Sequence, residues 1–175
     1  NNEFYNTHGG VYARHNVSDT ISTKVSDNYF ERIDDRAINV SCAYPEECYI
    51  ERNILNNVEY GISSDAHGTT YIRDNIIYNS NMAFRDLWSE VYITGNLLFD
   101  NYYSIYNHSG HNNTTHLTNN IFARFNDSNP SDFTDGTYGY MSFENPVATL
   151  YNCIYNINYT GENTMDNFPV GFGEI

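Results

Sequence analysis

The stretch that decides the fold runs from Tyr49 to Phe122, where one short phrase recurs four times. The phrase reads YIERNILNN from Tyr49, TYIRDNIIYNS from Thr70, VYITGNLLFDN from Val91 and THLTNNIFARF from Thr115. Each copy places an aliphatic residue three positions before an asparagine, and an apolar pair follows. The asparagines Asn53, Asn75, Asn96 and Asn120 are 22, 21 and 24 residues apart. A period in this range is typical of one supersecondary unit stacked on copies of itself.

The same register continues on both sides of this stretch. Towards the N-terminus it passes through Val25 with Asn28 and reaches Asn2. Towards the C-terminus it passes through Leu150, which places Cys153 at the asparagine position. The pattern therefore predicts about seven coils in 175 residues.

The residue types in the phrases favour strands over helices. Isoleucine, valine, tyrosine and phenylalanine dominate, and these residues suit a pleated surface. A leucine-rich horseshoe would need a leucine ladder and a helical return, but leucine is scarce and no 3.6-residue periodicity follows the phrases. Asparagine suits a tight corner, and asparagines on coils ~4.8 Å apart can form an amide ladder. We expect these core residues to point inward in aligned stacks: Ile50, Ile54, Ile72, Ile76, Ile93, Leu97, Leu117 and Ile121.

With these phrases, the chain resembles the right-handed parallel β-helix proteins of the pectate-lyase-like class. The similarity is carried by GISSDAHGTTYIRDNIIYNS from Gly61 and IYNHSGHNNTTHLTNNIFARF from Ile105, and it covers roughly residues 1–125 and 147–157. The resemblance implies an all-β, right-handed parallel β-helix. It also implies a secreted protein that acts on a polysaccharide, as a glycoside hydrolase or a polysaccharide lyase.

The domain organisation follows from where the repeat is interrupted. Residues 1–175 are expected to form a single β-helix domain. Residues 126–147 are rich in Gly, Pro, Ser, Asp and Asn, which predicts a loop excursion, and residues 160–175 are expected to be an end cap or tail. No amphipathic capping helix is visible at the N-terminus, and open rungs invite pairing. The chain is therefore interpreted as a fragment, as a homo-oligomer, or as a partner of the remainder of a cleaved chain.

The charge balance excludes several classes of partner. The chain has 22 acidic and 8 basic residues, which gives a net charge of −14. Nucleic acids and anionic membranes need basic patches, so neither is expected as a partner. No stretch approaches 18 consecutive apolar residues, so no membrane span is expected. Solubility is the plainer explanation of the acidity, and a surface that requires cations or is adapted to salt is the more specific one. The 17 tyrosines suit stacking against sugars.

The cysteines are interpreted for an extracellular protein, and the sequons matter only in an organism that glycosylates its proteins. Cys42 and Cys48 flank the turn-rich segment AYPEE and are expected to form a disulfide in an oxidising compartment, with Cys153 as a buried free thiol. Sequons for N-glycosylation occur at Asn16, Asn39, Asn107, Asn112, Asn113, Asn126 and Asn158.

A polar strip lies ten to fifteen residues after the repeat asparagines. Since coils stack, residues at equal offsets line up, and the strip gathers Arg14, His15, Asp65, His67, Arg85, Asp86, Trp88, Glu90, His108 and His111. The plainer interpretation is a solvated turn face, because loops are polar in general. Acids, bases and a stacking aromatic on adjacent coils instead favour a glycan site.

Two carboxylates of this strip are the candidate catalytic pair. Asp65 and Asp86 lie one coil apart, and a rung spacing of ~4.8 Å suits a retaining glycosidase. Glu90 is the alternative acid. The residues expected to bind substrate are His67, Arg85, Trp88, His108 and His111.

Three alternatives stay open beside hydrolysis. In a lyase, carboxylates would hold calcium while a base removes a proton, but Lys24 is the only lysine and the arginines are scattered. The same strip in a glycan-binding or adhesive module would bind without catalysis. A structural protein would stack its coils end to end into fibres.

Overall fold

The computed structural model describes residues 1–14, 22–65, 67–88, 90–107, 114–123, 140–143, 147–155 and 158–160. Within these residues every regular element is a β-strand. The same part of the chain contains no helix long and apolar enough to span a membrane.

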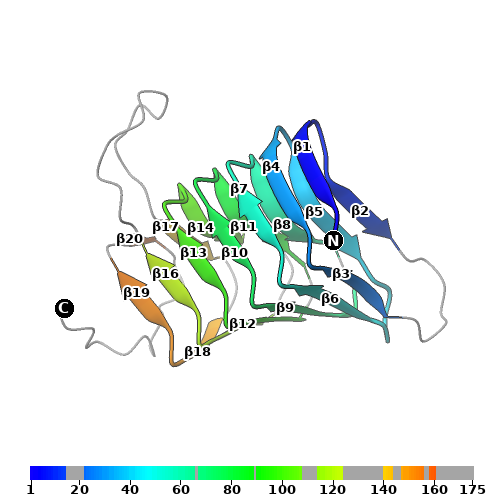
Figure 1. Cartoon of the computed structure of the whole chain (residues 1–175). Helices are drawn as coiled ribbons and strands as arrows, with labels where there is room; N and C mark the ends of the chain where they lie inside the picture. The colour runs from blue at the N-terminus through cyan, green and yellow to red at the C-terminus, as the bar shows by residue number, and fades with distance from the viewer. Residues whose placement is uncertain are drawn as a thin grey trace.

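The strands form three parallel sheets that extend along one axis (Figure 1). Sheet A contains β1 (Glu3–Thr7), β4 (Tyr29–Ile33), β7 (Ile54–Asn56), β10 (Ile76–Tyr78), β13 (Leu97–Phe99), β16 (Ile121–Ala123) and β19 (Cys153–Tyr155). Sheet B contains β2 (Val11–Arg14), β5 (Arg36–Ser41), β8 (Tyr60–Ser64), β11 (Met82–Leu87), β14 (Tyr103–Asn107), β17 (Tyr140–Phe143) and β20 (Asn158–Thr160). Sheet C contains β3 (Thr23–Ser26), β6 (Glu47–Glu51), β9 (Thr69–Arg73), β12 (Glu90–Thr94), β15 (Thr115–Thr118) and β18 (Val147–Leu150).

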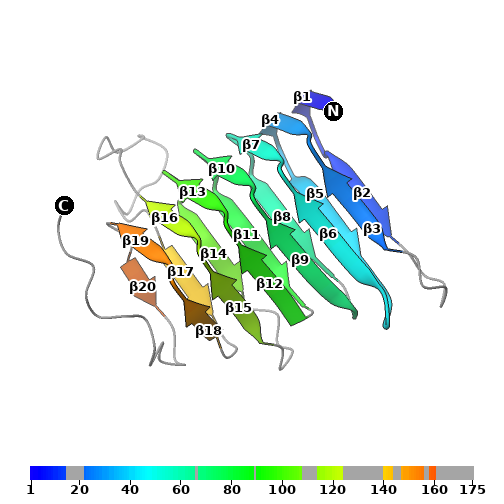
Figure 2. The same cartoon turned by 60° about the horizontal axis from the view of Figure 1, so that its bottom comes forward.

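Neighbouring strands of each sheet are three strands apart in the chain. Each coil therefore gives one strand to each sheet, and Figure 2 shows successive coils side by side. This arrangement confirms the predicted all-β class and the parallel β-helix. Strand β17 falls inside residues 126–147, which the sequence predicts as a loop excursion, and it continues sheet B by pairing with β14.

The repeat asparagines form the predicted ladder at the corner between sheets C and A. The side-chain Oδ1 of Asn75 accepts hydrogen bonds from the backbone N–H of Asn53 (2.9 Å) and from its Nδ2 (3.1 Å). Asn75 in turn donates both groups to Oδ1 of Asn96, at 2.9 and 3.0 Å. The residue before each ladder asparagine has a positive φ, as at Arg52 (53°) and Gly95 (70°). The left-handed backbone there makes the sharp corner.

The last rung of the ladder corrects one prediction. Asn120 donates to Oδ1 of Asn152, not to Cys153, and Cys153 is an exposed free thiol that pairs in register with Ile121. The predicted register aligns Leu150 with Leu117, whereas the structure pairs Leu117 with Thr149. A slip of one residue moves every side chain to the opposite face of a strand. The prediction of a buried Cys153 is therefore wrong.

The core prediction is correct for the strands of sheet C and wrong for those of sheet A. The side chains of Ile50, Ile72, Ile93 and Leu117 in sheet C are fully buried. In sheet A the second residue after each asparagine is the buried one, and these residues are Leu55, Ile77, Leu98 and Phe122. The ladder asparagine itself points inward, and strand side chains alternate. The first residue after it therefore points outward, as Ile54, Ile76, Leu97 and Ile121 do.

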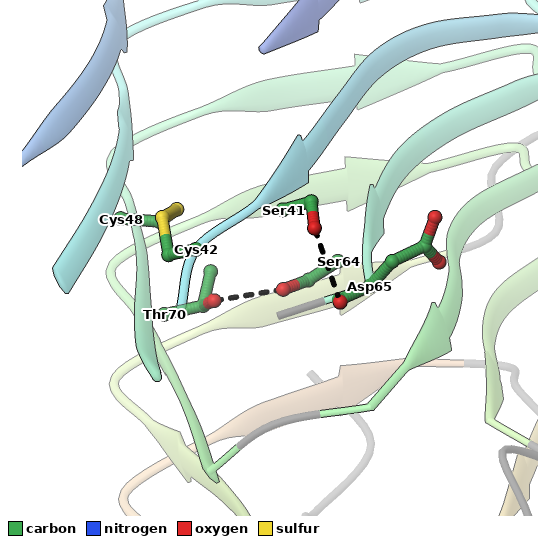
Figure 3. Close-up of a disulfide and its surroundings, with 6 residues drawn as sticks. All are labelled: Ser41, Cys42, Cys48, Ser64, Asp65 and Thr70. Carbon is green, nitrogen blue, oxygen red and sulfur yellow. Dashed lines mark hydrogen bonds between the residues drawn. A yellow bond between two sulfur atoms is a disulfide. The ribbon is translucent and has the colours of Figure 1, made fainter. Parts of the chain in front are cut away.

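Cys42 and Cys48 form the predicted disulfide, which joins the residue after β5 to β6 (Figure 3). Both cysteines are buried beside the core residues of sheets B and C. The disulfide therefore ties the corner between these two sheets to the core.

Candidate functional site

Apart from Glu90, the described residues of the polar strip lie along the end of sheet B and the corner that leads to sheet C. Asp65 directly follows β8, Arg85 and Asp86 lie in β11, and Trp88 directly follows β11. His15, His108 and His111 lie outside the described residues. The structure therefore brings Asp65, Arg85, Asp86 and Trp88 together on two adjacent coils.

Asp65 is held by the strand on the neighbouring coil. Its backbone N–H donates to the carbonyl of Val40 (2.9 Å), and its Oδ2 accepts from Nδ2 of Asn39 (3.2 Å). The adjacent Ser64 points the other way and bonds to Thr70 inside the coil (2.7 Å). Figure 3 shows the Asp65 carboxylate directed away from this interior pair. Asp65 therefore faces outward from sheet B, on a backbone fixed by hydrogen bonds.

Asp86 occupies a bulge in β11. The register pairs Arg85 with Ser63 and Leu87 with Ser64, so Asp86 is an extra residue, and its φ is 49°. The bulge takes Asp86 out of the alignment with Asp65 that the sequence spacing suggests. Its Oδ2 accepts a hydrogen bond from Nε of Arg85 at 2.9 Å. Bulges of this kind redirect a side chain and are common beside active sites.

The outer face of sheet B carries two columns of polar and aromatic side chains. One column contains Asn39, Ser63, Arg85 and Tyr106, and the other contains Arg36, Tyr60, Met82 and Tyr103. The guanidinium of Arg85 lies 4.0 Å from the ring centroid of Tyr60, and the rings of Tyr103 and Tyr106 meet edge to face at 5.1 Å. These contacts show that both columns project to the same side of the sheet.

Among the residues that the structure describes, three buried polar atoms on this face have no hydrogen-bond partner. They are Nε of Arg36, Oδ1 of Asn39 and Oγ of Ser63, and the side chains of Asn39 and Ser63 are 2% and 0% exposed. A buried polar group without a partner costs about 1–3 kcal/mol, and an ordered water, an ion or a ligand group can supply the missing bond. The sequence pattern does not single out Arg36 or Ser63, because their position depends on the strand register.

Glu90 and His67 lie apart from this face. Glu90 is the first residue of β12 in sheet C, and its Oε1 accepts from the hydroxyl of Tyr92 (2.8 Å) and lies 3.3 Å from Nε2 of His116. His67 is exposed in the loop between β8 and β9, where its backbone N–H donates to the carbonyl of Cys42 (2.8 Å). The sequence pattern groups both residues with Asp65. In the structure, Glu90 instead lies on the outer face of sheet C.

The outer face of sheet C is occupied by a continuous aromatic stack. The ring centroids of Tyr49, Tyr71, Tyr92 and His116 are 5.1, 5.3 and 4.4 Å apart in succession, with nearly parallel planes. Each inner ring covers the face of its neighbours. These tyrosines therefore stabilise the coils. The high tyrosine content suggests rings that stack on sugars, but in this stack the inner rings are covered by their neighbours.

The described residues hold no group of three or more His, Cys, Asp or Glu side chains arranged for a metal ion. Asn39 is the one sequon asparagine whose side chain is described. It is buried and bonded to Asp65, so a glycan on its Nδ2 would have to displace that contact. Asn107 ends β14 and Asn158 begins β20, while Asn16, Asn112, Asn113 and Asn126 lie outside the described residues.

Comparisons with models of protein families, with curated proteins and with solved structures returned no match.

Proposed function

We propose that this chain is a secreted protein that cleaves a polysaccharide on the outer face of sheet B, with Asp65 and Asp86 as the reacting carboxylates. The observation that carries the proposal is the set of unpartnered buried polar atoms on the same sheet face, one of them in Asn39, which is bonded to Asp65. Arg36 Nε is a donor, Asn39 Oδ1 is an acceptor, and Ser63 Oγ can be either. Sugar hydroxyls both donate and accept, so a single sugar chain has the chemistry to satisfy all three.

The two carboxylates have different surroundings, which suits different roles. Asp65 is bonded to the neutral amide of Asn39, and Asp86 is bonded to the guanidinium of Arg85. Glycosidases need one carboxyl group that protonates the leaving oxygen and one ionised carboxylate that attacks the sugar or activates water. We assign the acid role to Asp65 and the second role to Asp86.

Trp88 supplies an apolar surface next to the pair. Its backbone N–H donates to the carbonyl of Ser64 (2.8 Å), which places it beside Asp65, and its side chain is 38% exposed. An exposed indole is suited to stacking on a sugar ring. The disulfide between Cys42 and Cys48 supports an oxidising, extracellular location. Membership of the pectate-lyase-like class is part of the same proposal, and the parallel β-helix supports it.

Substitution of the carboxylates tests the proposal. Asp65→Asn and Asp86→Asn are each expected to abolish release of products from a panel of plant, algal and bacterial polysaccharides, while binding is retained. Asp74→Asn is the matched control, because Asp74 is an exposed aspartate with positive φ at a different corner. Trp88→Ala should weaken binding more than it slows the chemical step, since stacking holds substrate and transition state about equally.

A glycan-binding module without catalysis is the second candidate. It is favoured by the bulge, which takes Asp86 out of register with Asp65 and pairs it with Arg85. Binding without product release by the wild-type protein would support this candidate. Neither binding nor turnover on the whole panel would contradict both.

A further inference from the structure

A groove lies at the corner where sheet A turns into sheet B, away from the carboxylate pair. Its volume is about 560 Å³. The residues that line it come from equivalent positions of successive coils, from Asn6 after the middle of β1 to Tyr102 before β14. The groove therefore runs along the axis of the β-helix. Five coils spaced ~4.8 Å apart give it a length of roughly 19 Å.

The floor of the groove is buried and firmly held. Ile33, Val58 and Ser80 form it, and they are 1%, 2% and 4% exposed. The backbone N–H of Val58 donates to Oγ of Ser80 (3.2 Å), and that of Ser80 donates to Oδ1 of Asn101 (3.0 Å). This second side-chain ladder keeps the corner rigid, so the groove exists before any ligand binds.

One wall of the groove is a column of residues in the left-handed conformation. Arg32, Asn57 and Asn79 have φ values of 56°, 53° and 53°, and all three are exposed. The backbone N–H of Asn57 donates to the carbonyl of Tyr78 on the next coil (3.1 Å). Polar side chains therefore project at the same angle on each coil, on one side of the floor.

The opposite wall contains Asp34, Glu59 and Asn81. Nδ2 of Asn81 donates to Oε1 of Glu59 at 2.7 Å. The other carboxylate oxygen of Glu59 and the amide oxygen of Asn81 can then bond to a ligand. Among the described residues, the carboxylate of Asp34 and the side-chain amide of Asn57 have no hydrogen-bond partner. The two walls together present donors and acceptors on successive coils, above a floor that is partly apolar.

We propose that this groove is a second binding site, which takes a linear, neutral oligosaccharide. Sugar rings carry hydroxyls at their edges and C–H groups on their faces, which match polar walls and an apolar floor. The groove contains two carboxylates, Asp34 and Glu59, and one cation, Arg32, in a chain of net charge −14. This balance disfavours uronic-acid and sulfated chains. The proposal does not depend on the proposed cleavage, because the groove shares no residue with the outer face of sheet B.

The test measures binding to hexamers of cellulose, xylan, mannan, starch and chitin by calorimetry, with hexagalacturonate as the acidic comparator. Asn57→Gly with Asn79→Gly removes two wall amides while the left-handed backbone is kept, since glycine adopts it freely. We expect this double variant to bind the preferred neutral hexamer at least about tenfold more weakly, from two lost hydrogen bonds. Asn119→Gly is the matched control, because Asn119 is exposed at φ 55° on another corner.

The reference protein for these measurements is the variant Asp65→Asn with Asp86→Asn, which keeps the groove intact and removes the proposed cleavage. Tenfold weaker binding in the groove variant, with the Asn119→Gly control unchanged, supports the groove. Unchanged binding in a folded groove variant, preference for hexagalacturonate, or no binding of any hexamer overturns it. Failure of the proposed cleavage shows separately, as absent product release by the wild-type protein.

Discussion

Single asparagine side chains decide the path of this chain at its tightest corner. Asn75 is fully buried, and its Nδ2 donates to the carbonyl of Ile50 (2.9 Å) as well as to Asn96. Its Oδ1 accepts two hydrogen bonds from Asn53. One amide therefore satisfies polar groups on both neighbouring coils. Only asparagine and glutamine combine an amide donor with a carbonyl acceptor in one side chain, and glutamine is one carbon longer.

Asn75→Ala is expected to lower the free energy of unfolding by on the order of 3 kcal/mol. The change removes the side-chain partners of the Ile50 carbonyl and of the backbone N–H of Asn53, whereas Nδ2 of Asn53 keeps its bonds to the carbonyls of Val25 and Glu51. Each buried group left without a partner costs about 1–3 kcal/mol. Equilibrium denaturation in urea measures the loss. Asn56→Ala is the control, because Asn56 lies on the outer face of sheet A, outside the ladder, and its Oδ1 accepts a long bond from Asn79 (3.4 Å). Equal losses in the two variants would contradict a special role for the ladder.

Cys153 is expected to react with an alkylating reagent in the native, unreduced protein. It is exposed and free, whereas Cys42 and Cys48 are disulfide-bonded and buried. Mass spectrometry should find one modified cysteine in the native protein, and three after the protein has been reduced and unfolded. Cys153→Ser provides the control and should show none before reduction. If the native protein took up no label, Cys153 would be buried, as the repeat pattern predicts.

At the scale of the elements, each outer sheet face has its own chemistry. The outer face of sheet C stacks aromatic rings beside glutamates, and the hydroxyl of Tyr49 donates to Glu47. This hydrogen bond, together with partial burial, raises the pKa of Tyr49 to about 12. The bond from Tyr92 to Glu90 raises the pKa of Tyr92 in the same way. The neutral phenols are thus favoured in the folded state.

These tyrosines predict a loss of stability at high pH. A pKa that is higher in the folded state means that the stabilisation is complete below the unfolded value of about 10 and is lost as the pH rises towards 12. Glu47→Gln removes the negative charge, so Tyr49 should ionise closer to pH 10. NMR of ¹³C-labelled tyrosine follows each ring, and Glu90→Gln should move Tyr92 and not Tyr49. If Tyr49 titrated at the same pH in the wild type and in Glu47→Gln, the effect of Glu47 on the pKa of Tyr49 would be contradicted.

A matched pair of isoleucines tests the alternation of the strands. Ile72 is fully buried in sheet C, and Ile76 lies on the outer face of sheet A four residues later. Ile72→Ala should cost about 2–5 kcal/mol, as for other buried large-to-small changes, and Ile76→Ala less than about 1 kcal/mol. Urea denaturation of the two variants gives both values. A larger loss for Ile76→Ala would show that the outward orientation is wrong.

The sequence predicts the coils and the ladder because both repeat locally. An asparagine that follows an aliphatic residue by three positions is a short-range pattern, and it locates Asn53 through Asn120. It does not locate Asn152, because the last phrase has no aliphatic residue at the required spacing before that asparagine. Nor does it predict the bulge at Asp86, which depends on pairing between β11 and β8. The site residues Arg36 and Ser63 are hidden for the same reason, since strand register is a long-range property.

For the whole molecule, the surplus of negative charge is the dominant electrostatic feature. Among the described residues, ion pairs with carboxylates are formed by Lys24, Arg32, Arg52, Arg73 and Arg85, in a chain with 22 acidic and 8 basic residues. The remaining acidic residues therefore have few cations to neutralise them. Such a surplus keeps a protein soluble and destabilises its compact state through self-repulsion.

Added salt is accordingly expected to stabilise this protein. Between about 10 and 100 mM NaCl the Debye length falls from about 30 to about 10 Å, which screens distant like charges more than close ion pairs such as Arg52 with Asp27 (2.7 Å). If screening contributes about 1 kcal/mol, the Tm should rise by about 2–4 °C. Thermal unfolding followed by circular dichroism measures this rise. A fall in Tm would show that the ion pairs outweigh the repulsion, and a larger rise in CaCl₂ at equal ionic strength would identify a bound calcium ion.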